Sequence, residues 1–274
     1  MGKIAISTGH GFFGLIFWQL VIGAVLLGAL SLAGGPFRPG RGAFAFAALI
    51  AVIGTIIPNS TFYLAVAHLP AGIMSILIAT VPILAFPLAL ALGMDRVSLA
   101  RVVGLGCGIA GVALIALPEA SLPSAAAAAW LPVALIGPLF YAIEGNVVAR
   151  IGTAGMSAVQ AMFLVSAVGA VLVLPLALGS GQFIDPFAAW GAAEWALVFS
   201  SIAHSFAYAA YVWLASRAGA VFASQCSYIV TGTGVIWAML LLGERFSHWV
   251  WGALAIMLVG LALVQPRPRD RTPV

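Results

Sequence analysis

The feature that most constrains this chain is a succession of long apolar runs separated by short polar breaks. The runs lie at residues 12–33, 43–67, 71–92, 99–117, 128–149, 157–178, 191–214, 219–242 and 246–265. Each is long enough to cross about 30 Å of hydrocarbon as a helix. Only helices and closed barrels satisfy their backbone polar groups in lipid, and these runs are continuous rather than alternating. The sequence therefore predicts an all-α polytopic membrane protein with nine visible transmembrane helices.

The placement of arginine predicts the orientation. Only 7% of the residues are charged, and the basic ones stand singly or in pairs between the runs, which argues against nucleic acid as a partner. With the C-terminal tail in the cytoplasm, only Lys3 and Arg245 fall outside. The cytoplasmic breaks then hold Arg38, Arg41, Arg96, Arg101, Arg150, Arg217, Arg267, Arg269 and Arg271. We expect a multi-pass protein of the cytoplasmic (inner) membrane, with the lipid bilayer as its surroundings and a cytoplasmic C-terminus.

Two stretches resemble each other, "LALGMDRVSLARVVGLGCGIAGVAL" and "LLLGERFSHWVWGALAIMLVGLAL". After one insertion, the first turn (Gly93, Asp95, Arg96, Ser98) matches the second (Gly243, Glu244, Arg245, Ser247). The spacing from Ser98 to Gly111 equals that from Ser247 to Gly260. Small and apolar residues match easily in any membrane protein. The joint agreement of turn, charges and glycines nevertheless favours a true repeat.

The repeat is predicted to be inverted, because an odd number of crossings separates the two charged turns and places them on opposite faces. Inverted repeats are typical of secondary transporters, whose substrate site lies between the halves. We expect the repeats to span residues 1–118 and 127–266. The second has five runs and the first has four, so one further helix is expected upstream of Phe12, with "MGKIAIS" as its outer end. A truncated start is the favoured explanation, and a natural nine-helix form is the alternative.

These motifs resemble the drug/metabolite transporter superfamily, EamA type. The segments "AHLPAG" and "SRAGA" resemble the first turn of the family's halves, and "LLLGERFS" resembles the second. The first-half turn, "LGMDRVS", departs from the family's "LGER-S". The resemblance covers nearly the whole chain. It implies a ten-helix plan in two five-helix halves and the transport of small metabolites, commonly export.

Glu144, in the stretch "LFYAIEGNVVAR", is the main functional candidate. Ionisable residues inside spans are rare and usually face a cavity. Tyr141 precedes Glu144 by three residues, so the two share a helix face. A carboxylate in such a cavity is a candidate for binding a proton or a cationic group. The alternative is that Glu144 pairs with Arg150 or reaches cytoplasmic water.

Polar stripes on three other runs are further candidates for a substrate site. They are Asn59 with Tyr63, then His204 with Tyr208 and Tyr211, and Gln225 with Tyr228. Residues three, four or seven apart lie on one face of a helix. The alternative for each stripe is hydrogen bonding between helices, which is a common use of polar residues in membrane bundles. We also expect glycines 104, 108, 111, 252 and 260 to permit close helix packing.

The leading functional prediction is a secondary transporter, and not an enzyme, that acts as a permease for the efflux of small molecules. One carboxylate with several tyrosines and amides suits an amphipathic metabolite, such as an amino acid, and proton coupling would use the same carboxylate. The alternatives are a membrane-embedded enzyme and a passive channel. The sequence holds no metal-ligand spacing and no nucleotide-binding motif, so we expect no cofactor.

Overall fold

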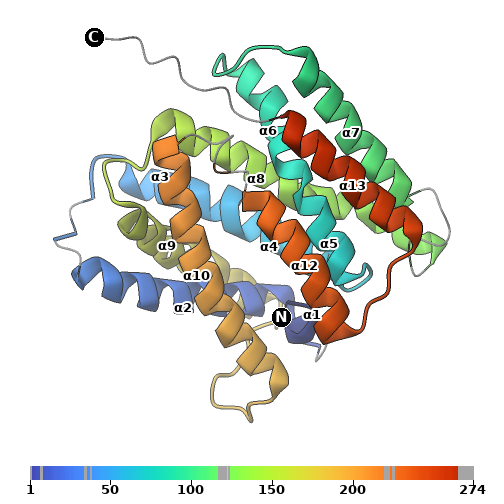
Figure 1. Ribbon diagram of the computed structural model, residues 1–274. Helices are drawn as coiled ribbons and strands as arrows, with labels where there is room; N and C mark the ends of the chain where they lie inside the picture. The colour runs from blue at the N-terminus through green and yellow to red at the C-terminus, as the bar shows by residue number, and fades with distance from the viewer. Residues whose placement is uncertain are drawn as a thin grey trace, which may run out of the picture.

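The protein is described by a computed structural model that places residues 2–6, 9–33, 36–37, 39–116, 122, 124–218, 223 and 226–264 (Figure 1). Throughout these residues the regular elements are helical. They are α1 (Gly2–Ile6), α2 (Phe12–Ala33), α3 (Ala43–Ile50), η1 (Ala51–Ile56), α4 (Ile57–Val66), α5 (Ala71–Ile78), α6 (Thr80–Ala91), α7 (Leu99–Ala116), η3 (Ala125–Trp130), α8 (Leu131–Ile151), α9 (Ala158–Gly179), α10 (Ala192–Ala218), α12 (Cys226–Leu242) and α13 (His248–Leu263). The predicted Arg38, Arg267, Arg269 and Arg271 lie outside the described residues.

Helices occupy the predicted apolar runs, and most of these helices are of membrane length. In the described part of the chain, seven helical segments are long and apolar enough to cross a membrane. Three of them are composite: α3, η1 and α4 form one span, α5 and α6 form another, and η3 extends α8. The last two runs correspond to the shorter apolar helices α12 and α13. The prediction of an all-helical polytopic membrane protein is therefore confirmed.

The two charged turns have the same backbone geometry. Gly93 follows the span that ends with α6, and Gly243 follows α12. Their φ angles are 68° and 66°. This left-handed conformation ends a helix readily only where no Cβ interferes. The two turns therefore agree in backbone conformation as well as in sequence.

Helices that the repeat makes equivalent pack against each other. The pairs are α2 with α9, the α5 segment with α12, and α7 with α13. Figure 1 shows α7 and α13 together at one end of the molecule and α2 with α9 at the other. Equivalent elements meet in this way when an approximate two-fold axis relates two halves. The inverted two-repeat architecture expected from the sequence is observed.

The α7–α13 contact is close because it is built on glycine. A Cβ at Gly104 would lie 2.7 Å from the Gly260 carbonyl oxygen, and a Cβ at Gly260 would lie 2.8 Å from that of Gly104. Gly111 similarly approaches the Ala253 carbonyl, at 3.3 Å. In the repeat alignment Gly104 matches Ala253 and Gly111 matches Gly260. The repeat symmetry therefore converts the Gly104–Gly260 contact into the Gly111–Ala253 contact. The close-packing prediction was wrong for Gly252, because nothing lies within 4 Å of its Cβ position.

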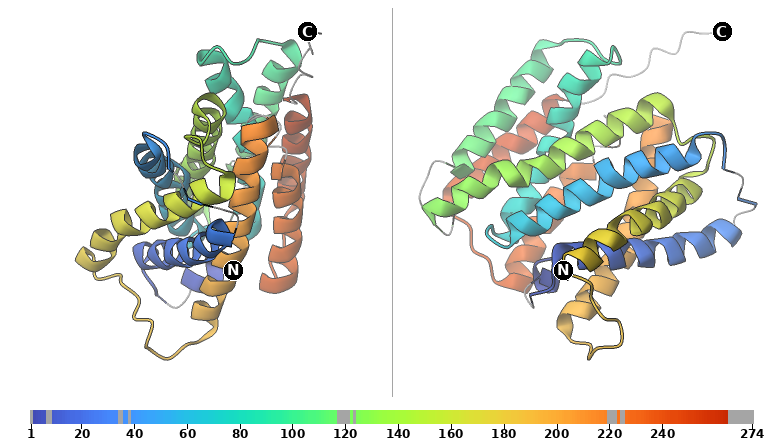
Figure 2. Two further views of the ribbon diagram at one scale, coloured as in Figure 1. Left: turned by 90° about the vertical axis from the view of Figure 1, so that its left-hand side faces the viewer. Right: turned by 180° about the vertical axis from the view of Figure 1, so that it is seen from behind.

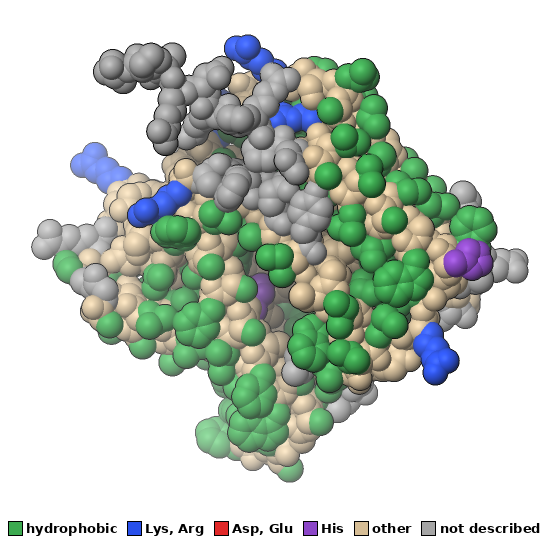
Figure 3. All heavy atoms as spheres, in the orientation of Figure 1, with side chains coloured by type: hydrophobic (Ala, Val, Ile, Leu, Met, Phe, Trp, Pro, Cys, Tyr) green, Lys and Arg blue, Asp and Glu red, His purple; other side chains and the backbone are tan. Residues whose placement is uncertain are grey.

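Successive spans place the connections alternately on two faces of the molecule. The arginine face carries Arg41, Arg96, Arg101, Arg150 and Arg217, and the acidic face carries Asp185, Glu194 and Glu244 together with Lys3 and Arg245. Between these faces the exterior is apolar: Ile229, Ile236, Trp237 and Leu240 of α12 are all exposed. In Figure 3 hydrophobic side chains cover the front of the molecule and basic ones lie near its margins. Such an exterior is suited to lipid contact.

The middle of the molecule is formed where α4, α8 and α10 meet. Seen from behind, α8 and the α3–α4 segment run side by side (Figure 2). The α8 helix also contacts η1, α6 and α10. The buried apolar core divides into two main clusters, one where α3, α9 and α10 meet and one where α5, α8 and α13 meet. Polar side chains enter the centre of the bundle from α4, α8 and α10.

Candidate functional site

A carboxylate and a phenol form the centre of the candidate site. Glu144 on α8 is fully buried, and the Tyr208 hydroxyl on α10 donates a hydrogen bond to its Oε1. Its Oε2 has no hydrogen-bond partner among the described residues. Arg150, the alternative partner, instead donates to the Leu92 carbonyl oxygen at 2.8 Å. The structure therefore favours a buried role for Glu144 over pairing with Arg150.

The backbone of η1 lies directly against this pair. A Cβ on Gly54 would be 2.6 Å from Glu144 Cδ and 2.7 Å from its Oε2, and it would also collide with the Tyr208 hydroxyl. Only glycine permits this approach. The six residues of η1 form a π-helix, a wide turn that often occurs at functional sites. Three segments, η1, α8 and α10, thus position the carboxylate.

Two cavities extend from the centre of the bundle. The large cavity has a volume of about 290 Å³ and is lined by Asn59 and Tyr63 of α4, Tyr141 of α8 and His204 of α10, among others. The small cavity, of about 10 Å³, is bordered by Tyr208. That volume is room for about one water molecule. Gln19 and His204 line both cavities, so the two are neighbours.

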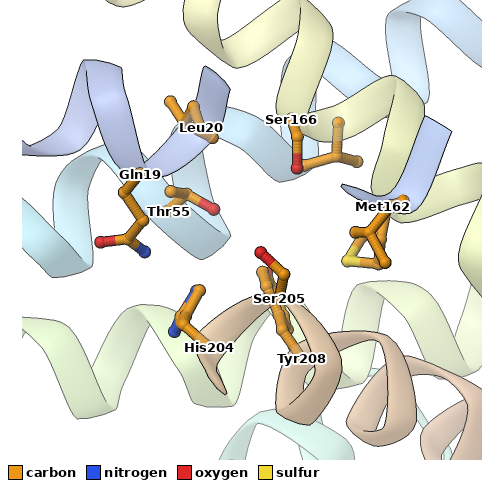
Figure 4. Close-up of a pocket in the computed structure, with 10 residues that line it drawn as sticks. Gln19, Leu20, Thr55, Met162, Ser166, His204, Ser205 and Tyr208 are labelled. Atoms are coloured by element: carbon orange, nitrogen blue, oxygen red, sulfur yellow. The ribbon is translucent and has the colours of Figure 1, made fainter. Parts of the chain in front are cut away.

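Figure 4 shows the small cavity and the side chains around it. Gln19, Leu20 and Thr55 lie across the space from His204, Ser205 and Tyr208, while Ser166 and Met162 of α9 close the remaining side. This wall combines α2 and η1 of the first half with α9 and α10 of the second. A group held here would contact both halves of the protein at once.

Several polar atoms that line these cavities or lie next to them have no protein partner in the described part of the chain. They include Asn59 Nδ2, His204 Nε2 and Glu144 Oε2. Buried polar atoms are nearly always hydrogen-bonded, and an unsatisfied one costs about 1–3 kcal/mol. Three such atoms around one pair of cavities indicate that this region can bind polar groups of a ligand or water.

The structure brings together six of the eight site residues predicted from the sequence. Asn59, Tyr63, Tyr141 and His204 line the large cavity, and Glu144 is bonded to Tyr208 beside the small one. Gln225 and the side chain of Tyr228 lie outside the described residues. The stripes on α4, α8 and α10 therefore meet around these two cavities, but Glu144 and Tyr211 line neither of them.

Sequence reasoning missed Gln19, Thr55, Ser166 and Ser205, which line the small cavity. A signal for Gln19 was available, since it is the one amide in the apolar run 12–33. Polar residues inside spans usually face the bundle interior. The serines and threonine gave no such signal, because these hydroxyls commonly bond to their own helix. Ser205, for example, donates to the Ser201 carbonyl at 2.7 Å.

Asn146, two residues after Glu144, has a different role. Its Nδ2 donates to the Ala85 carbonyl at 3.1 Å and to the Ala142 carbonyl at 2.9 Å. Two residues along a helix is about 200° of rotation, so the two side chains point to nearly opposite sides. Asn146 therefore joins α8 to α6 and takes no part in the cavities. No three His, Cys, Asp or Glu side chains in the described residues lie close enough together to hold a metal ion.

Comparison with known proteins identifies the family. The sequence profile of the EamA-like transporter family matches residues 1–117 and again residues 128–265. The chain belongs to the EamA-like transporter family. Its members are membrane transporters of the drug/metabolite type, so this EamA-like protein is a multi-pass membrane protein that acts on small molecules. The two matched stretches correspond to the two repeats.

Structural comparison shows that a solved protein shares this fold. A solved structure titled "Crystal structure of protein" superposes with a TM-score of 0.64 at 17% sequence identity. The match covers 95% of this chain and 88% of the other. Identity at this level bears on the fold alone. A comparison with curated proteins found no match.

Proposed function

We propose that this protein is a secondary transporter that exports small metabolites across the cytoplasmic membrane by exposing its central cavities alternately to either side. The observation that carries the proposal is the fully buried Glu144 carboxylate beside cavities lined by both halves. A buried carboxylate is costly, and in membrane spans such residues commonly mark substrate or ion pathways. The inverted repeat supplies two similar halves that can exchange conformations.

The lining of the large cavity supports a small amphipathic substrate that bears an amine. Its volume, about 290 Å³, lies at the low end of the range for small-molecule sites. Tyr63, Tyr141 and Phe62 supply aromatic surface, and Asn59 and Gln19 supply amides. Aromatic faces attract ammonium groups, and the amides can bind a carboxylate or hydroxyl. Amino acids and their analogues have this combination.

Glu144 gives a simple means of coupling transport to protons. Tyr208 donates to Oε1 and so orients the carboxylate, while Oε2 remains available to a proton or to a substrate amine. A proton and a substrate amine cannot both neutralise the carboxylate at the same time, so the binding of one excludes the binding of the other. Binding of substrate on one side and of a proton on the other would then exchange the two across the membrane.

The orientation follows from the arginine face. Connections rich in arginine lie in the cytoplasm, so we place the arginine face and the C-terminus there. The acidic face, with Asp185, Glu194 and Glu244, is then external. Export would begin with the cavities open toward the arginine face.

The test is transport by purified protein in proteoliposomes, with a panel of labelled amino acids and amines. Saturable uptake that is accelerated by unlabelled substrate on the opposite side distinguishes a carrier from a channel. We expect Glu144→Gln to reduce this exchange by about tenfold or more, and to abolish its dependence on pH between about 5 and 8. Asp185→Asn is the matched control, because it neutralises an exposed carboxylate of the acidic face. Unchanged exchange in Glu144→Gln would refute the proposed role.

A further inference from the structure

The carboxylate of Glu244 joins the two halves of the protein at the acidic face. Glu244 lies in the turn between α12 and α13, in the second half. Its Oε1 accepts hydrogen bonds from the Ala71 backbone N–H at 2.8 Å and from Lys3 Nζ at 3.1 Å, and its Oε2 accepts from the Gly72 N–H at 3.0 Å. All three donors belong to the first half. The Glu244 side chain is only 12% exposed, so water screens its two bonds to the α5 backbone poorly.

The geometry is that of a carboxylate capping a helix. Ala71 and Gly72 are the first residues of α5, whose free N–H groups and dipole favour a negative charge. Phe246 of the same turn packs over Gly72, where a Cβ would collide with its ring. One turn further along α5, Met74 and Ser75 line the large cavity. Glu244 therefore fixes the end of a helix that forms part of the cavity wall.

A second carboxylate links the halves on the same face. His10, just before α2, lies 2.6 Å from Glu194 at the start of α10, measured from Nε2 to Oε1. Glu194 Oε2 also accepts from the Gly191 N–H at 2.7 Å. The acidic face is thus held together at two separate places by side-chain contacts between opposite halves.

The equivalent carboxylate at the arginine face makes a different set of contacts. Asp95 matches Glu244 in the repeat, but its Oδ1 accepts from the Arg96 N–H at 2.7 Å and its Oδ2 pairs with Arg101. Both partners belong to its own half. The equivalent carboxylates therefore have different partners. Glu244 binds the opposite half at the acidic face, and Asp95 binds its own half at the arginine face.

We propose that Glu244 is a clamp that keeps the acidic face closed, and that the clamp must open before the large cavity can communicate with that side. Glu244 is a positioning residue: it acts through α5 and does not touch the cavity. This inference rests on the proposed alternating-access function, yet it concerns access to the cavity and can be measured without any substrate.

The test is the reactivity of one cysteine in the large cavity. Ser200 of α10 lines this cavity, and Ser200→Cys is introduced after Cys107→Ala and Cys226→Ala remove the native thiols. A membrane-impermeant maleimide is applied from one side only, using vesicles of known and opposite orientations. We expect Glu244→Ala to raise the labelling rate from the acidic side by about tenfold, as the loss of a charge-assisted hydrogen bond implies.

Three comparisons make the result decisive. Asp95→Ala, the matched control, should leave labelling from the acidic side unchanged, because the contacts of Asp95 with the described residues are to Arg96 and Arg101 of its own half. Labelling from the arginine side should not rise in Glu244→Ala, whereas general loosening of the protein would raise it from both sides. Glu244→Gln keeps the shape and one acceptor oxygen, so it should give an intermediate rate, and it decides the matter if the alanine variant fails to fold.

Labelling of folded Glu244→Ala and Glu244→Gln at the parent rate would overturn the clamp. A rise from the acidic side in a protein that exchanges no substrate would instead support the clamp and refute the proposed transport function. The two proposals therefore fail by different measurements.

Discussion

Gly54→Ala tests whether the π-helix positions the Glu144–Tyr208 pair. The added methyl would lie 2.6 Å from Glu144 Cδ and 2.7 Å from Oε2. Carbon atoms pack best at about 3.5–4.0 Å, so η1 and α8 must separate by about 1 Å or the carboxylate must turn away. Overpacking of this kind costs about 1–3 kcal/mol. Because the same methyl also collides with the Tyr208 hydroxyl, the hydrogen bond to Glu144 should be lost or distorted.

The assay combines stability with substrate binding. A cost of about 1–3 kcal/mol should lower the melting temperature by about 2–4 °C for each kcal/mol. If the binding step bears a similar cost, affinity should fall by about 5-fold to 150-fold. Gly106→Ala is the matched control, since Gly106 lies inside α7 with nothing within 4 Å of its Cβ position. There alanine should be neutral or slightly stabilising. Wild-type affinity and melting temperature in Gly54→Ala would show that η1 does not define the site.

The remaining predictions concern the site, the orientation and the repeat interface. Tyr208→Phe removes the hydroxyl that donates to Glu144. Substrate affinity, measured by calorimetry, should fall by about tenfold to 150-fold. An unchanged affinity would place the substrate site elsewhere. A cysteine at Ser180 should react with an impermeant thiol reagent outside intact cells while one at Thr272 should not; the reverse pattern would invert the proposed orientation. Gly104→Ala should lower the melting temperature, because its methyl would meet the Gly260 carbonyl, whereas Gly252→Ala should not; equal melting temperatures would argue against a tight α7–α13 contact.

The sequence alone determined the membrane architecture. In lipid the backbone must bond to itself, so an apolar run of about 20 residues has one available structure, and its length is visible in the sequence. The inverted repeat was equally readable, because the turns at Gly93 and Gly243 need a left-handed residue and carry matching charges. Glu144 could be singled out because an ionisable residue within a span is rare.

Other features depended on how each helix is rotated about its axis and where it crosses its neighbours. No local sequence pattern predicted that Tyr208 rather than Arg150 would contact Glu144. The partner depends on where α8 and α10 cross and which faces they turn toward each other. The π-helix at Gly54 and the place of Gln19 between the two cavities arise in the same way.

The role of Glu244 is the clearest case of a feature that only the tertiary structure decided. Its turn reads in the sequence as a polar break with balanced charges, equivalent to the turn at Asp95. The fold gives Glu244 the helix end of the other half and gives Asp95 an arginine of its own half. Hydrophobicity fixes which segments enter the membrane, because it acts residue by residue. Hydrogen bonds across the bundle depend on positions within a few tenths of an ångström, and these exist only once the helices have packed.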